Sequence, residues 1–283
     1  MRVVFAGPIR SAFFAERMGW REWAEEICLF VENKDKPTGK KKESFSEFIS
    51  GIIVVLVSAT FIITFIIQAF EIPSGSMEDT LLVGDHVFVD RLTPMARGSF
   101  LGALMPYRQI KRGDIIVFLH PKQPGMYVVK RVMGIPGDKI HLKDGVVYRN
   151  GQPLNEPYLH PHDRPNSPYR DNFPAIAPGP LDDAVSEMQM TIMMNKQGDD
   201  LVIPPDKYFG MGDHRDVSLD SRYWGFIPRE NIVGRPLFIY WSFETPSDQY
   251  ERRQAGERLS FLLHVIVHFF DQTRWSRMFH LVR

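Results

Sequence analysis

Pro73-Ser74-Gly75-Ser76-Met77 is the stretch around which the chain is arranged, because it directly follows the one long apolar run. That run carries no charge over residues 48–70, which are 23 positions. As a helix they would measure about 35 Å, enough to cross a hydrocarbon core of about 30 Å. The proline and glycine of the stretch favour a tight non-helical turn. The sequence predicts a transmembrane helix over 48–70, followed either by a turn that presents a serine at the membrane surface or by a plain linker.

Charged residues on the two sides of the run predict its orientation. Five lysines stand within residues 33–43, whereas the first charged residues after the run are acidic. The positive-inside rule then makes residues 1–47 a cytoplasmic segment with a Lys-rich linker and puts the rest outside. The single cysteine, Cys28, precedes the run, so no disulfide can form within one chain. A net charge of zero gives no indication of a nucleic-acid partner.

Residues 71–250 have the pattern of a turn-rich β domain. Short apolar runs bounded by glycine and aspartate predict strands at 86–89, 115–118, 126–133, 139–143, 146–149, 152–154 and 232–241. Asp144-Gly145 and Asn150-Gly151 separate three of these runs. Such dipeptides are the strongest short-range signals of a β-hairpin, so this ribbon is predicted as an extended hairpin.

Two segments depart from the β pattern. Residues 155–200 contain seven prolines and predict a long irregular insertion, with one more hairpin near 186–194. Residues 259–270 are apolar over twelve positions, about 18 Å as a helix and too short to span a bilayer. Arginines and aromatic residues follow them, so 251–283 predicts a helix that lies in a membrane interface or docks on the β domain.

A serine hydroxyl is a weak nucleophile and needs a base. Nine histidines are present, but none stands in a recognisable triad context. His264 and His268 share a helical face, yet Val265 occupies the place where a zinc-protease helix has glutamate. No metal site is therefore expected.

Lysine is the other candidate base, and Lys130 is unusual in its surroundings. On a strand its face is shared with Val128 and Val132. Burial on an apolar face favours the neutral amine. Lowering the pKa of a lysine from about 10.4 to about 8 takes about 3 kcal/mol, which partial burial can supply. A neutral Lys130 amine could take the proton from Ser76.

Four blocks of sequence occur in order after the apolar run and resemble bacterial type I signal peptidases. Together they extend over residues 70–235, and their order after a single span is very specific. They are Pro73–Met77, Arg112–Phe118, Lys130–Asp138 and Gly212–Gly225.

The resemblance implies a role for each matched residue. Ser76 would be the nucleophile and Lys130 the general base. The Ser74 hydroxyl and the Ser76 backbone N–H would form an oxyanion hole, while Ser218 would orient the Lys130 amine. The substrate pockets would be lined by Phe70, Ile72, Met77, Leu81, Val128 and Val129. A structural polar network near the site would comprise Arg131, Asp213, Arg215, Asp220 and Arg222.

The resemblance also implies a fold and a reaction. The fold would be mostly β, with packed antiparallel sheets forming the catalytic domain and the long hairpin as an extension. The reaction would be amide hydrolysis through an acyl-enzyme, with no metal, nucleotide or other cofactor. The substrates would be exported preproteins with small residues one and three places before the cleaved bond. Cleavage would occur at the outer face of the bacterial cytoplasmic membrane, with lipid as the other partner.

Two positions depart from the pattern of the family, and two other functions are compatible with parts of the sequence. Asp79 stands where proline is usual, and His214 where asparagine is common. One alternative is a soluble-type Ser/Lys self-cleaving repressor, which the apolar run and the lack of a preceding DNA-binding segment disfavour. The other is a membrane-tethered, non-catalytic β scaffold, which would not need Ser76 and Lys130 together.

Overall fold

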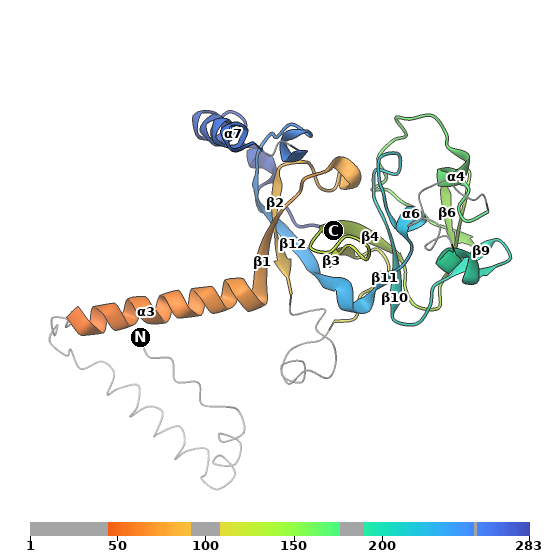
Figure 1. Ribbon diagram of the computed structural model, residues 1–283, viewed down its shortest axis with the longest axis horizontal. Helices are drawn as coiled ribbons and strands as arrows, with labels where there is room; N and C mark the ends of the chain where they lie inside the picture. Colours follow the sequence, from red (N-terminus) through yellow and green to blue (C-terminus); the bar gives the residue numbers. More distant parts are fainter. Residues whose placement is uncertain (1–44, 92–107, 176–189, 252–253) are drawn as a thin grey trace, which may run out of the picture. The chain divides into compact units, whose positions relative to one another are not determined.

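The computed structural model describes residues 45–91, 108–175, 190–251 and 254–283 (Figure 1). The chain divides into two compact units, Met1–Leu56 and Val57–Arg283. Except for residues 45–47, the expected cytoplasmic segment, with Cys28, lies outside the described residues.

The apolar run is helical only in its first part. Helix α3 (Phe45–Phe61) continues into a π-helical turn, η1 (Ile62–Ile66), and then into strand β1 (Ile67–Glu71). The expected helix over 48–70 is thus wrong for its last residues, because β1 pairs with strand β2 (Asp85–Asp90). A uniformly apolar run does not distinguish helix from strand by periodicity, so the tertiary pairing decides. Within the described ranges, no helix combines the length and apolar character needed to cross a membrane.

The larger sheet has seven strands in the order β1-β2-β12-β3-β4-β10-β11, and all neighbours pair antiparallel. Its other members confirm the strands predicted around 115–118, 126–133 and 232–241. They are β3 (Ile115–Leu119), β4 (Tyr127–Gly134), β10 (Lys207–Met211), β11 (Ile227–Pro228) and β12 (Ile232–Ser242).

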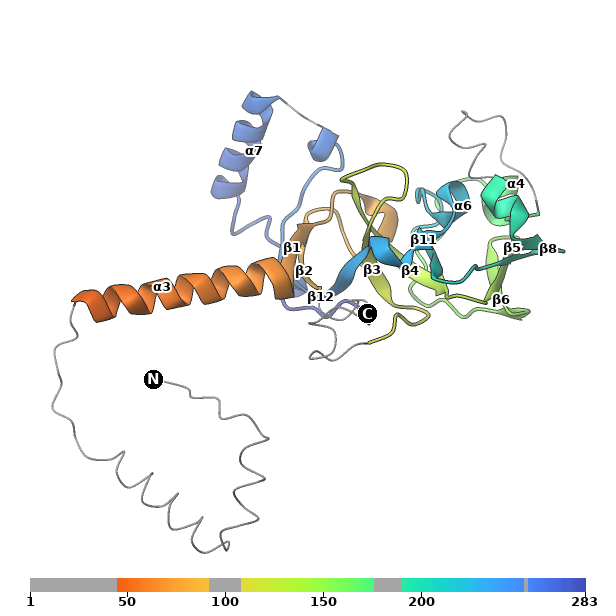
Figure 2. The same ribbon diagram turned by 60° about the horizontal axis from the view of Figure 1, so that its bottom comes forward.

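The second sheet has five strands in the order β7-β6-β5-β9-β8 and contains the predicted hairpin. Its strands are β5 (Lys139–Lys143), β6 (Val146–Arg149), β7 (Gln152–Pro153), β8 (Lys196–Gln197) and β9 (Asp200–Val202). Both predicted turns are confirmed, since Asp144, Gly145, Asn150 and Gly151 all have positive φ, between 50° and 82°. The hairpin is not isolated, because β9 pairs with the other edge of β5. Figures 1 and 2 both show this sheet beyond β10, away from β1 and β2.

The proline-rich segment contributes to the core. It contains a short helix, α4 (Pro168–Asp171), and residues 190–194 are also helical. The hairpin expected near 186–194 is therefore wrong for residues 190–194, which the structure describes as helical. A hairpin instead lies just after them, where β8 and β9 pair around Gly198. Phe173 and Ile192 are buried against the strands, which ties this segment to the domain.

Strand β3 separates two clusters of buried apolar side chains. Ile116 and Phe118 belong to the large core, which extends to the second sheet. Ile115 and Val117 belong to the small core, which lies under the Ser76 turn. Alternate residues of a strand point to opposite faces, so β3 supports both clusters at once.

Over residues 254–283, which the structure describes, the C-terminal segment is helical in α7 (Ala255–Val267) and η5 (Trp275–Arg277). The helix expected over 251–283 is wrong beyond α7. There the Phe279 N–H donates to the Ile239 carbonyl at 2.7 Å and the Val282 N–H to the Leu237 carbonyl at 3.0 Å. Strand β3 is paired with β12 only as far as Gly234, so the tail supplies hydrogen bonds to the next part of β12.

A buried carboxylate fixes the tail to the domain. Asp85 is 0% exposed, and Arg277 reaches it with Nε at 3.1 Å and Nη2 at 2.6 Å. The Ser242 hydroxyl and the Leu82 N–H also donate to this carboxylate. The charge of Asp85 is thereby compensated by a residue far along the chain.

Replacing Arg277 by alanine should lower the free energy of unfolding by about 1–3 kcal/mol, because buried Asp85 loses both hydrogen bonds from this guanidinium and keeps only Arg274, at 4.0 Å, as a cationic neighbour. The remaining hydrogen bonds limit the loss. Urea unfolding of the full chain in detergent measures it. The matched control is Arg258→Ala on α7, where the side chain is exposed and a change within about 0.5 kcal/mol is expected. Equal stability of the two variants would contradict the role of Arg277.

Candidate active site

Ser76 lies on a short 3-10 turn, η2 (Gly75–Met77), held from both sides. The Ile72 N–H donates to the Asp85 carbonyl at 2.9 Å, and the Gly84 N–H to the Ile72 carbonyl at 3.0 Å. The Met77 side chain is buried in the small core. Asp79 ends the turn with a φ of 73°, which a proline ring cannot adopt. We call residues Ser74–Asp79 the nucleophile turn.

Lys130 reaches Ser76 from strand β4 of the seven-stranded sheet. Its Nζ lies 2.6 Å from the Ser76 Oγ, within hydrogen-bond distance. Strand β4 positions it opposite Ile116 of β3, and its side chain is only 3% exposed. Its strand neighbours Val128 and Val132 pack against the large core, as the sequence predicted. The structure therefore brings together the two residues expected to form the dyad.

Burial is the main influence on the charge of this amine. It lowers the pKa of Lys130 to about 8, and nearby Arg222 acts in the same direction. The carboxylates of Asp220 and Asp213 raise the pKa and oppose the shift, but burial prevails. A substantial neutral fraction near neutral pH is what a general base requires.

Each of these two carboxylates is bound to an arginine instead of to Lys130. Arg131 holds Asp213 with two hydrogen bonds, of 2.8 and 2.7 Å. Arg222 holds Asp220 in the same way, at 2.9 and 2.8 Å, and both members are completely buried. Burial raises the pKa of Asp220, but the charge and hydrogen bonds of Arg222 leave it below its ordinary value.

The predicted polar network is present, and it includes two members that the sequence did not identify. Arg215 donates to the Gly212 carbonyl at 3.1 Å and pairs with Glu156, whose side chain is 6% exposed. Thr80 donates to Asp213 at 2.6 Å. Glu156 lies in the segment interpreted as an irregular insertion, and Thr80 follows the turn, so neither carried a local signal.

Two glycines make room for the dyad. A Cβ on Gly212 would lie 2.3 Å from both the Ser76 carbonyl oxygen and the Ser218 hydroxyl. A Cβ on Gly210 would lie 3.2 Å from the Lys130 Cβ and 2.8 Å from the Ile227 Cδ1. The close approach of β10 to both catalytic candidates requires residues without side chains at these places.

The two serines expected to support the dyad, Ser74 and Ser218, differ in how the observed structure bears on their expected roles. Ser74 lies on the same turn as Ser76, with 3.4 Å between the hydroxyl oxygens. Ser218 was expected to bond to the Lys130 amine, but this is wrong for the conformation observed, because its buried hydroxyl makes no hydrogen bond. It packs on Gly212 instead, so it lies beside the dyad without orienting the amine.

Five of the six residues expected to line the substrate pockets lie in one cluster. Ile72, Met77 and Leu81 are buried in the small core, with Phe70 and Val129 packed on it and partly exposed. Val128 is the exception, since it packs against the large core. Strand alternation accounts for the separation, because Val128 and Val129 point to opposite faces of β4.

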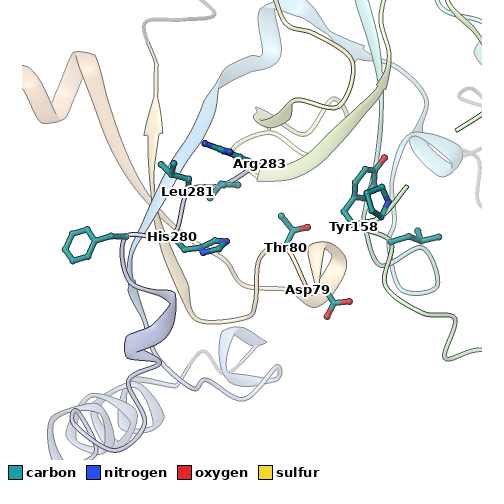
Figure 3. A pocket seen from close by; sticks show the side chains of 10 residues that line it. Asp79, Thr80, Tyr158, His280, Leu281 and Arg283 are labelled. Carbon is teal, nitrogen blue, oxygen red and sulfur yellow. The ribbon is translucent and has the colours of Figure 1, made fainter. Parts of the chain in front are cut away.

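The C-terminal tail forms one side of a pocket next to the turn (Figure 3). In this view Thr80 and Asp79 lie between Tyr158 and the tail residues, which run from Phe279 to Arg283. Arg131 stacks on the Tyr158 ring at 3.8 Å and donates to the Arg283 carbonyl oxygen at 3.3 Å. No motif in the sequence predicts that the tail returns to the site.

Comparisons with known proteins identify the family of this chain. The family model for signal peptidase, peptidase S26, matches residues 45–241. Signal peptidase I of Aquifex aeolicus is 33% identical over 227 residues, which cover 69% of this chain and 84% of that protein. Signal peptidase I of Buchnera aphidicola from Schizaphis graminum is 30% identical over 253 residues, covering 75% and 80%.

A crystal structure of a signal peptidase I from Enterococcus faecalis is 28% identical, with a TM-score of 0.34, and covers 45% of this chain and 97% of that one. The family match extends over most of the chain and includes Ser76, Lys130 and the strands that hold them. The chain therefore belongs to the signal peptidase family, peptidase S26, and is a peptidase.

Proposed function

We propose that this chain is a membrane-anchored serine endopeptidase that removes signal peptides from exported preproteins. The observation that carries the proposal is the distance of 2.6 Å between the Lys130 Nζ and the Ser76 Oγ, in a site where the lysine is buried. The class of substrate follows from relatives named signal peptidase I. Ser76 is the nucleophile and Lys130 the general base.

The first half of the reaction forms an acyl-enzyme. The neutral Lys130 amine takes the proton of the Ser76 hydroxyl while its oxygen attacks the carbonyl carbon before the scissile bond. The oxyanion is stabilised by the Ser76 backbone N–H and by the Ser74 hydroxyl, which lies on the same turn. The Lys130 ammonium then gives its proton to the departing amine, so the peptide bond breaks and a serine ester remains.

The second half releases the signal peptide. A water molecule takes the place of the amine product, and the neutral Lys130 removes its proton as it attacks the ester. When the tetrahedral intermediate collapses, the proton returns to the Ser76 oxygen. Lys130 acts first as a base and then as an acid in each half, which requires a pKa near the working pH.

Membrane anchoring rests on the surface of α3. Its apolar side chains are exposed, including Phe48 at 55%, Ile53 at 54% and Val55 at 66%. A helix that is apolar on all sides has its stable environment in lipid. Lysines before it place residues 1–47 in the cytoplasm and the peptidase domain outside the bacterial cytoplasmic membrane. The exposed apolar side chains of α7, among them Leu262, Leu263 and Ile266, give a second contact with the interface.

The non-catalytic scaffold is the weaker alternative. Holding Lys130 buried at a pKa of about 8 costs about 3 kcal/mol of stability, since the charged form is favoured in water. A scaffold gains nothing from this cost. The self-cleaving repressor shares the dyad, but the family match and the apolar α3 favour a membrane peptidase.

Ser76→Ala and Lys130→Arg should each lower kcat/KM for a preprotein at least about 10³-fold, because one loses the attacking oxygen and the other has a permanently charged side chain. Both should remain folded by circular dichroism. Lys139→Arg, at an exposed lysine that begins β5, is the matched control and should cleave normally. Measurable turnover by Lys130→Arg would exclude a lysine base.

The pH profile should follow the neutral form of Lys130. Protonation inactivates the base, so activity is present above the folded pKa of about 8 and is lost as the pH falls below it. Between pH 5 and 7, kcat/KM should rise roughly tenfold per pH unit, and it should level off above pH 8. Steady-state cleavage of one preprotein across this range measures the profile. A constant rate down to pH 5 would rule out this assignment.

Cleavage should require small residues, such as alanine, one and three places before the bond. An extended substrate points these two side chains to the same face, and the wall of Phe70, Ile72 and Val129 leaves little depth there. The side chain between them points away and should be tolerated. A preprotein series with alanine, leucine or phenylalanine at each place tests this. Efficient cleavage after phenylalanine would exclude a shallow pocket, and selectivity at the middle place would exclude extended binding.

A further inference from the structure

Two imidazoles and a carboxylate meet beside the nucleophile turn. His160, Asp163 and His214 each offer an atom that can bind a metal, and these atoms all lie within 4.8 Å of one another. The His214 Nε2 lies 3.2 Å from an Asp163 oxygen, and the two rings are 4.1 Å apart between centroids. His214 is buried, while His160 is partly exposed and Asp163 is exposed. The sequence predicted no metal site, and His214 lies far along the chain from His160 and Asp163.

Each of the two rings has a carboxylate at its other nitrogen. The His160 Nδ1 lies 2.8 Å from an Asp79 oxygen, and the His214 Nδ1 lies 3.3 Å from a Glu78 oxygen. This leaves the Nε2 of each ring as the atom for a further ligand. A histidine that binds a metal commonly donates its second N–H to a carboxylate, which fixes the ring and strengthens its metal bond.

The charge of the cluster also favours a cation. Glu78, Asp79 and Asp163 contribute three negative charges, and in the part of the chain that the structure describes their ion-pair partners are the two histidines. With neutral imidazoles the group is therefore strongly negative. An ordinary structural pair elsewhere in this chain, such as His141 with Asp200, contains one ring and one carboxylate only.

We propose that His160, His214 and Asp163 bind a divalent transition-metal ion of the Zn²⁺ class, with Asp79 and Glu78 supporting the two rings. Ligand atoms around a tetrahedral zinc lie about 3.4 Å apart, given bonds of about 2.0–2.1 Å. The pair formed by His214 and Asp163 already has about this spacing, at 3.2 Å, and the ligand atom of His160 lies within 4.8 Å of both. Imidazole donors select such ions over Mg²⁺ and Ca²⁺.

The site would act on the nucleophile turn without taking part in the chemistry. The His214 backbone N–H donates to the Ser76 carbonyl at 3.2 Å, and Glu78 and Asp79 belong to the turn itself. A bound ion would cross-link this turn to the loop that carries His160 and Asp163. Asp79 and His214 are also the two positions at which this chain departs from the usual sequence of the family, so the site would be a property of this chain.

The test uses the full chain in detergent, purified without a histidine tag and stripped with a chelator. Calorimetric titration with Zn²⁺ alone should show one ion per chain, and Co²⁺ should give a visible spectrum typical of nitrogen and oxygen ligands in a tetrahedral site. Mg²⁺ and Ca²⁺ should show no binding. Zn²⁺ should raise the Tm. The absence of a stoichiometric Zn²⁺ site in the wild-type chain would overturn the proposal.

Variants assign the ligands. His160→Asn and Asp163→Asn, both at accessible positions, should lower the Zn²⁺ affinity at least about 100-fold and abolish the Tm shift. Asp79→Asn should lower it roughly 10- to 100-fold, as for loss of a supporting carboxylate. His141→Asn is the matched control, because it removes an imidazole paired with Asp200 and should bind Zn²⁺ as the wild type does. His160→Asn and Asp163→Asn proteins that bind like the wild type would refute the site, whether or not a His214 variant folds.

Discussion

The exclusion of water from one lysine amine is the constraint on which the rest of the site depends. In the proposed mechanism, Lys130 acts as a base only while burial outweighs the attraction of the nearby carboxylates of Asp213 and Asp220. Arginine partners hold both carboxylates, so neither forms an ion pair with the amine. Gly210 of β10, and Gly212 just after it, allow the backbone to lie close to Lys130 and Ser76. The polar network, the small residues and the packed strands thus serve a single requirement, a neutral amine next to a hydroxyl.

The sequence predicts correctly the features that depend on neighbours along the chain. Both two-residue hairpin turns are confirmed, since aspartate or asparagine followed by glycine adopts the required left-handed backbone at low cost. The strands around Lys130 are confirmed because alternation of apolar residues fixes which face they bury. The pairing of Ser76 with Lys130 was inferred from that alternation together with a resemblance between blocks, and the structure brings the two atoms together.

The structural features that the sequence did not predict depend on contacts between distant segments. Strand β1 replaces the end of the expected helix because β2 offers it a partner, and a uniformly apolar run carries no signal of this choice. The tail leaves its helix to complete β12 and to neutralise Asp85, and nothing near Arg277 predicts either contact. The proposed metal site is of the same kind, since its ligands and their supporting carboxylates come from three separate segments. The expected hydrogen bond from Ser218 to the Lys130 amine is wrong for a different reason. A resemblance between sequences indicates where a residue lies, but not which way its hydroxyl points.

The alternation of strand β4 makes folding fidelity a condition of activity. Lys130 points to the nucleophile and Arg131, its immediate neighbour, points to Asp213 on the other side. A pairing error of one residue between β3 and β4 would exchange the two, because side chains alternate along a strand. A guanidinium would then stand beside Ser76 and an amine beside the carboxylate, with no base left at the site. Under the proposed mechanism, a misfolded molecule of this kind would have no residual activity.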